Sequence, residues 1–127
     1  MLYNKDWNSS PTAKLLRETA DIIDTDGLSQ YYLFSDGAYC IQGALMSAIG
    51  ISDDIIGDGD GWSAVKKSPL HGVYTSALTA VCHSLGGEMG ECTVSSVSVT
   101  RWNNDSARTK EVVVTKLREV ADSLVTA

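Results

Sequence analysis

Residues 101–109 read RWNNDSART and connect a segment rich in valine and serine to the last helical pattern of the chain. We expect Trp102 to plug the core at a junction between a strand and that helix. Asn103 or Asn104 can hydrogen-bond its own backbone in an Asx-type turn, and Thr109 is a favourable N-cap for the helix. The stretch therefore predicts a structural junction, with a ligand or partner contact by the same loop as the alternative.

The last helix is expected from Thr109 to about Val125, with charged residues around an apolar stripe. Just before it, Arg108 can reach Asp105 across the turn, although an exposed ion pair of this kind contributes little stability. The apolar stripe consists of Val113, Leu117, Val120, Ala121 and Leu124. One face of this helix is therefore predicted to join the core.

The first helix is expected within SSPTAKLLRETADIIDTDG, residues 9–27. Ser10 can accept hydrogen bonds from free N–H groups as the N-cap, Pro11 suits the first helical position, and Gly27 suits the residue after the end. The aromatic run that follows, YYLF, leads into Asp36-Gly37, a pair that adopts positive φ at low cost. This pattern predicts a short strand and a turn.

The middle of the chain predicts a second helix from about Tyr39 to Gly50, and then a long polar loop over residues 51–69. A third helix is expected to begin at Ser68 and to end near Leu85. Residues 91–102 alternate valine with serine and predict a strand. The predicted architecture is mainly α (α+β at the margin). We expect one globular domain over residues 1–127, a compact bundle of about four helices with one or two short strands.

The overall composition narrows the function classes. A formal net charge of −6 and a pI near 4.7 argue against nucleic acid as a partner, because such binding requires basic residues at the phosphates. The first ten residues hold no apolar leader and no stretch has the length of a membrane span, so we expect no membrane partner. The odd set of three cysteines is untypical of a secreted disulfide scaffold and favours a reducing cytoplasm.

The acidic loop and the histidines do not form a metal-ligand pattern. When Gly61 takes the sixth position of an EF-hand loop, Ile56 takes the first position, which needs an oxygen ligand. The zinc candidates have no paired ligand spacing and are His71, Cys82, His83 and Cys92. On one helix, His71 and Cys82 would be separated by about 16 Å along the axis. We therefore expect neither a metal ion nor a cofactor.

A cysteine hydrolase is the sharpest enzymatic hypothesis. Cys40, His71 and Asn103 occur in the order found in papain-like enzymes, and Cys40 lies at an expected helix N-terminus, where the dipole would lower its pKa. In such a site the thiolate attacks, His71 acts as the base and Asn103 orients it. The alternative is that Cys40 is a structural thiol, because thiols are among the most buried side chains.

The segment RWNNDSARTKEVVVTKLREVAD resembles the ending of an uncharacterised family found in actinobacteria and their phages, whose members end in a Trp-Asn-Asp turn, a polar gap, Arg-Thr and an amphipathic helix. LLRETADIIDTDGLSQ, CIQGALMSAIG and TSALTAVCHSLG are similar to its other helices, including a Cys-x-x-Gly-Ala-Leu helix. The matching positions are Cys40, Gly43, Ala44, Leu45, Trp102, Asn103, Arg108 and Thr109. This chain departs at Asn104, with Asp105 one position late, and at Leu28 instead of an aromatic residue. The resemblance implies a fold and a biological setting, without a reaction.

These observations together predict a non-catalytic accessory protein of a phage or mobile element that binds a host protein. The acidic charge fits a partner with a basic patch, and a homo-oligomer is compatible with the sequence. One alternative is a protein that sequesters a small molecule, for instance a nucleotide signal, through the Trp102 loop; the other is the Cys40 hydrolase. The candidate binding residues are Cys40, Trp102, Asn103, Asn104, Asp105, Arg108 and Thr109.

Overall fold

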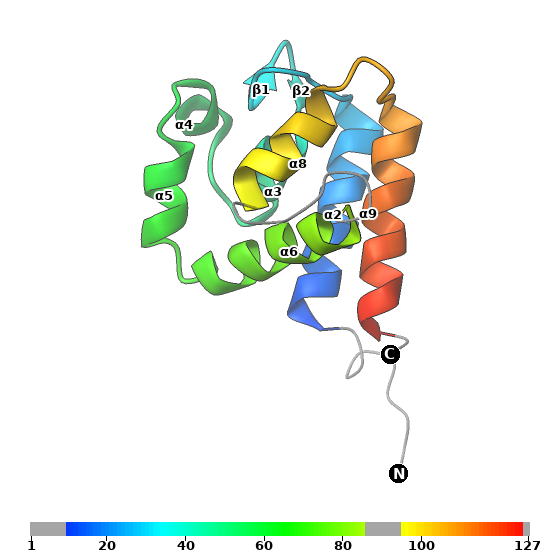
Figure 1. The fold of residues 1–127 in the computed structure, drawn as a ribbon. Helices are drawn as coiled ribbons and strands as arrows, with labels where there is room; N and C mark the ends of the chain where they lie inside the picture. Colours follow the sequence, from blue (N-terminus) through cyan, green and yellow to red (C-terminus); the bar gives the residue numbers. More distant parts are fainter. Residues whose placement is uncertain (1–9, 86–94, 126–127) are drawn as a thin grey trace.

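The computed structural model describes residues 10–85 and 95–125, which form helices and one small hairpin (Figure 1). The helices are α2 (Pro11–Asp26), α3 (Ile41–Ala48), α4 (Asp53–Gly57), α5 (Gly61–Lys67), α6 (His71–Ser84), α8 (Ser95–Asn104) and α9 (Lys110–Val125). The strands are β1 (Phe34–Ser35) and β2 (Ala38–Tyr39). The expected class, mainly α with one or two short strands, is confirmed. None of the described helices is long and apolar enough to cross a membrane.

Helices α2 and α9 lie side by side along one side of the molecule (Figure 1). The expected caps are present: the Ser10 hydroxyl accepts a hydrogen bond from Ala13 N at 3.0 Å, and the Thr109 hydroxyl accepts one from Val112 N at 3.2 Å. The buried stripe of α9 contains Val113, Val114, Leu117, Val120 and Ala121. Leu124, which the sequence assigned to that stripe, is 38% exposed instead.

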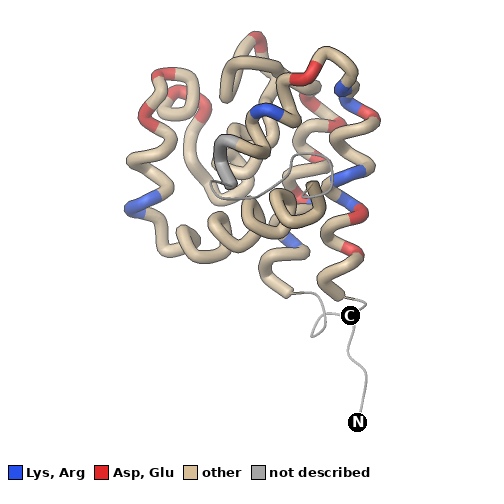
Figure 2. Tube along the Cα trace, in the orientation of Figure 1, with Lys and Arg blue, Asp and Glu red and all other residues tan. Residues whose placement is uncertain are grey.

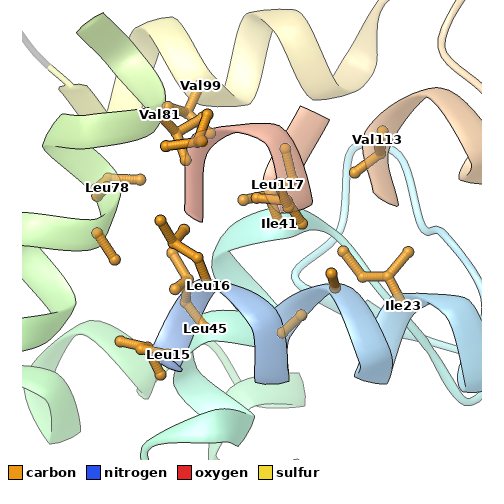
Figure 3. Packing of buried hydrophobic residues seen from close by; sticks show 14 of the residues in the cluster. Leu15, Leu16, Ile23, Ile41, Leu45, Leu78, Val81, Val99, Val113 and Leu117 are labelled. Carbon is orange, nitrogen blue, oxygen red and sulfur yellow. The ribbon is translucent and has the colours of Figure 1, made fainter. Parts of the chain in front are cut away.

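The core is centred on α3, a short and mostly apolar helix whose first six residues are all buried by its neighbours. In Figure 3, Leu45 of α3 lies beside Leu16 of α2. Leu78 and Val81 of α6 lie across from them. Val99 of α8 closes the core from above, as drawn in that view. Burying these aliphatic side chains, each contributing about 1.5–3 kcal/mol, is the main stabilising term.

The predicted strand and turn are confirmed as the hairpin of β1 and β2. Phe34 pairs with Tyr39 in antiparallel register, and the connecting residues Asp36 and Gly37 have φ of 52° and 82°. These two positive φ values are those of a tight hairpin turn whose twist matches the strands. The hairpin delivers the chain directly into α3.

The long loop expected over residues 51–69 is wrong, because the segment forms α4 and α5. The Ser52 hydroxyl caps α4 by accepting from Ile55 N at 3.4 Å, and the carboxylates of Asp53 and Asp54 complement its dipole. The third helix also begins later than expected, at His71. Ser68 ends α5, and its hydroxyl accepts from Leu70 N at 3.0 Å.

The strand expected over residues 91–102 is wrong for the described part, because residues 95–104 form helix α8, while residues 91–94 lie outside the described residues. Val99, Trp102 and Asn103 are buried together, at the i, i+3, i+4 spacing of one helical face. This face packs on α3 and α6. Burial of the face outweighs the modest strand preference of β-branched residues.

Candidate functional site

The candidate site is built at the start of α3, where the hairpin meets the C-terminal end of α8. Cys40 is the N-cap of α3, and its Sγ accepts a hydrogen bond from Gly43 N at 3.3 Å. Cys40 N in turn donates to Leu33 O at 3.2 Å. A Cβ atom on Gly43 would lie 1.8 Å from that same Leu33 oxygen, so only glycine fits. The Cys-x-x-Gly pattern is therefore a capped helix start pressed against the backbone before β1.

Asn103 joins this helix start to α8. Its Oδ1 accepts from Ile41 N at 3.0 Å, and its Nδ2 donates to Ser29 O at 3.0 Å. The side chain is 1% exposed. Asn103 therefore satisfies a free N–H group at the N-terminus of α3 from another helix. The Asx turn expected of Asn103 is wrong, because its amide bonds distant backbone groups instead of its own.

Asn104 and Gln30 fasten the segment before the hairpin to the end of α8. Asn104 Oδ1 accepts from Tyr31 N at 2.7 Å, which holds Tyr31 at a φ of 73°. Gln30 Nε2 donates to Asn103 O at 3.0 Å and to Asp105 O at 2.8 Å, so it supplies partners to carbonyls at the helix end. A non-glycine residue at such a φ is strained and persists only where its surroundings hold it.

Trp102 and Arg108 pack against each other at the end of α8 and in the turn after it. Trp102 is 2% exposed, which confirms that it plugs the core, but it does so from helix α8 and not from a strand end. The expected side-chain pair of Arg108 with Asp105 is wrong. The guanidinium of Arg108 lies 4.4 Å from the centre of the Trp102 ring. The Asp105 carboxylate accepts from Ala107 N at 2.9 Å and makes the turn before Thr109.

A small cavity of about 70 Å³ opens where these segments meet. Two tyrosines at its rim are the most exposed large hydrophobic side chains among the described residues: Tyr31 is 74% exposed and Tyr32 is 66% exposed. The cavity is far smaller than a typical ligand pocket of about 300–1,000 Å³. Its lining residues are Tyr31, Tyr32, Leu33, Cys40, Ile41, Gln42, Val99, Thr100, Asn103 and Asn104.

The three residues of the hydrolase hypothesis do not share this cavity. Cys40 and Asn103 line it, whereas His71 begins α6, is exposed and is not among the lining residues. Burial raises the pKa of the Cys40 thiol, although backbone N–H groups partly oppose the shift. Both amide ends of Asn103 are also engaged by backbone groups. The geometry lacks the thiolate–imidazole contact that nucleophilic activation requires.

The sequence predicts no metal site from the four zinc candidates, His71, Cys82, His83 and Cys92. His83 is exposed on α6, as its helical position predicts, while Cys82 is buried and disulfide-bonded. Cys92 lies outside the described residues. Within the described ranges, no three His, Cys, Asp or Glu side chains group closely enough to hold a metal ion.

Acidic residues gather at the end of the molecule that carries the hairpin and α4 (Figure 2). Helix α4 packs beside β1, and Tyr39 OH donates to Asp53 Oδ1 at 2.6 Å. Burial, followed by this hydrogen bond, raises the pKa of Tyr39. The acidic residues at this end are Asp36, Asp53, Asp54, Asp58, Asp60 and Asp105, all of them exposed. The basic residues on α8 and in the turn after it are Arg101 and Arg108.

Sequence reasoning missed the segment from Ser29 to Leu33, which supplies the exposed rim and the backbone partners of Asn103 and Asn104. The adjacent pair Tyr31-Tyr32 was a usable signal, because two aromatic residues ahead of a turn need either a core position or a partner. The positive φ of Tyr31 left no signal in the sequence, because Asn104, 73 residues away, imposes it.

The model of a protein family described as a family of unknown function (DUF6197) matches residues 8–123. No curated protein and no solved structure matches the chain.

Proposed function

Because the chain belongs to the DUF6197 family, whose function is unknown, its role has to be inferred from the site, and we propose that it is a non-catalytic protein that binds another protein. The observation that carries the proposal is the exposure of Tyr31 and Tyr32, 74% and 66%, at the rim of a cavity whose segments are joined by hydrogen bonds. Tyrosines presented in this way are typical anchors of protein interfaces, because the ring is apolar and its hydroxyl can still bond at the edge.

The frame around the tyrosines favours binding of a folded or extended protein segment. Asn104 Oδ1 holds the backbone of Tyr31 by accepting from its N–H. The side chain of Gln30, the residue before Tyr31, is held by its hydrogen bond to Asn103 O. A surface that is already ordered before binding loses less conformational entropy when a partner docks. We propose that the partner is a host protein and that this protein is encoded by a phage or mobile element of actinobacteria. This part of the proposal rests on the family resemblance.

The cavity volume favours this function over sequestration of a nucleotide signal. A volume of about 70 Å³ is well below the roughly 300–1,000 Å³ of a typical small-molecule pocket, so this cavity does not enclose a nucleotide. We therefore expect cyclic nucleotides and nucleotide alarmones to leave the melting temperature unchanged. A shift of several degrees with any of them would favour the small-molecule alternative.

The test of protein binding uses the tagged protein as bait in a lysate of the bacterial host, with matched substitutions. Tyr32→Ala removes a ring that is 66% exposed, so the fold is retained while the anchor is lost. Leu70→Ala is the control, because Leu70 is 43% exposed at the start of α6 and does not line the cavity. We expect a host protein to be captured by the unchanged protein and by Leu70→Ala, and to be lost with Tyr32→Ala. Equal capture by both variants would refute binding at this site.

A further inference from the structure

The site also indicates the chemistry of its partner. Building on the proposed function, we propose that the cavity receives one short aliphatic side chain from a basic peptide segment, whose Arg or Lys residues contact the surrounding tyrosines and aspartates. The aliphatic side chain supplies the buried contact, and the basic residues on either side supply the charge match. Each half of this assignment follows from a different feature of the site.

The cavity selects an apolar group of limited size. Its lining is mainly apolar and includes Leu33, Ile41, Val99 and Cys40, beside the polar residues Gln42 and Thr100. The side-chain amide of Asn103 is hydrogen-bonded to the backbone of Ile41 and Ser29, so it does not serve as a partner for a bound side chain. Because most of the lining surface is apolar, a polar side chain that enters this space would lose hydrogen bonds to water and find few replacements. The volume of about 70 Å³ admits a branched aliphatic side chain more readily than an aromatic ring.

The charge around the cavity selects a basic partner. Six exposed aspartates lie at this end of the molecule, on the hairpin, on α4 and its neighbouring turns, and after α8, against Arg101 and Arg108 (Figure 2). Arg108 is directed at the Trp102 ring. Helices α2 and α9 carry charges of both signs, including the ion pairs that join them, and α5 carries Lys66 and Lys67. An excess of carboxylates at this end of the molecule attracts a positively charged segment and repels an acidic one.

The exposed tyrosine rings add a second preference for basic side chains. The face of a tyrosine ring attracts a cation, and the planar guanidinium of arginine stacks on it more often than the lysine ammonium does. The same geometry exists within this molecule, where Arg108 lies over Trp102. Tyr31 and Tyr32 precede the hairpin that carries Asp36, so the rings and this carboxylate belong to one continuous stretch of the chain. The expected motif is therefore an aliphatic residue flanked by arginine or lysine.

The experiment is a selection from a randomised seven-residue peptide library displayed on phage, with the purified full-length protein immobilised. We expect the selected sequences to place Val, Leu, Ile or Met at one position and Arg or Lys on both sides of it. Enrichment of acidic flanks, of an aromatic anchor, or of no motif above the Tyr32→Ala control would overturn the proposal.

The best peptide is then synthesised and its affinity measured by titration calorimetry against charge variants. Asp58→Lys places a cation at the C-terminal end of α4, where the helix dipole tolerates it, and Asp36→Asn keeps a residue type that accepts positive φ. We expect the double variant to bind at least tenfold more weakly at 0.15 M salt, with a smaller difference at 1 M salt because of screening. Unchanged affinity would refute the basic half of the assignment.

The two proposals fail in different ways. If the bait captures a host protein in a Tyr32-dependent manner but the library selects no basic motif, protein binding stands and the assignment of a basic aliphatic segment is wrong. If capture is independent of Tyr32, the proposed function itself is wrong at this site.

Discussion

Replacing Asn103 with alanine removes the link between α8, the start of α3 and the segment before the hairpin. The substitution leaves Ile41 N and Ser29 O without the partners that now lie 3.0 Å away from each. Both groups belong to buried residues, and each unsatisfied backbone group costs about 1–3 kcal/mol. We therefore expect the free energy of unfolding to fall by about 4 kcal/mol, a large share of the about 5–15 kcal/mol of an ordinary domain.

The assay is urea denaturation followed by far-UV circular dichroism and tryptophan fluorescence. With a slope of about 1.5 kcal/mol per molar urea, the loss corresponds to a midpoint lower by roughly 2–3 M, at an unchanged slope. The control is Asn104→Ala, which removes the acceptor for the N–H of exposed Tyr31 and is expected to cost about 1 kcal/mol. A loss below about 1 kcal/mol for Asn103→Ala would refute the reasoning.

A third variant, Asn103→Asp, separates the two hydrogen bonds by pH. The carboxylate still accepts from Ile41 N but faces Ser29 O without a proton, so burial should raise its folded-state pKa above the ordinary value of about 3.9. A raised folded-state pKa stabilises the fold fully below the unfolded pKa, and this stability is lost as the pH rises through the folded pKa. The variant should therefore lie closer to the unchanged protein at pH 4 than at pH 7, and the reverse order would contradict the assignment.

Three further predictions concern single sites. Gly43→Ala should lower the free energy of unfolding by at least about 3 kcal/mol in urea denaturation, because its Cβ would lie 1.8 Å from Leu33 O. Gly72→Ala is the control: its Cβ would meet open space on α6, so it should raise the free energy of unfolding by about 0.5–1 kcal/mol. Burial raises the pKa of Cys40, so its thiol should react with a thiol reagent more slowly than an unfolded cysteine, and the rate should rise only above the ordinary thiol pKa. Mass spectrometry of the peptide that contains Cys40 measures the labelling rate. Rapid labelling below pH 7 would instead support the hydrolase hypothesis. Thr109→Ala should lower stability by about 1 kcal/mol through loss of the α9 cap, and no change in the midpoint would argue against that cap.

Sequence reasoning worked where local chemistry decides the structure. Ser10, Thr109 and the Asp36-Gly37 turn were assigned correctly, because caps and hairpin turns depend on residues only a few positions apart. The junction at Asn103 could not be predicted in the same way. Its partners, Ile41 and Ser29, lie 62 and 74 residues away, so the short-range Asx turn was the natural but wrong interpretation.

The errors in secondary structure have a common physical cause. The valine–serine alternation before Trp102 has a period of two, but the buried face of α8 is decided by Val99, Trp102 and Asn103 at helical spacing. In residues 51–69 the glycines and aspartates favour a loop, yet the cap at Ser52 and burial of Ile56 are sufficient for a helix of one to two turns. In both segments the contacts of a few buried side chains override weak local preference.

The two family-like patterns, Cys-x-x-Gly and Trp-Asn, meet in one structural unit. Asn103 bonds the residue directly after Cys40, and Gly43 packs against the backbone that leads from Tyr32 into the hairpin. Of these residues, Cys40, Ile41 and Asn103 are buried and form the floor of the cavity, whereas the exposed rim belongs to the tyrosines. Substitutions in the floor should therefore lower stability and binding together, while substitutions in the rim should lower binding alone. This division separates a fold signature from a recognition surface, even though both line the same small cavity.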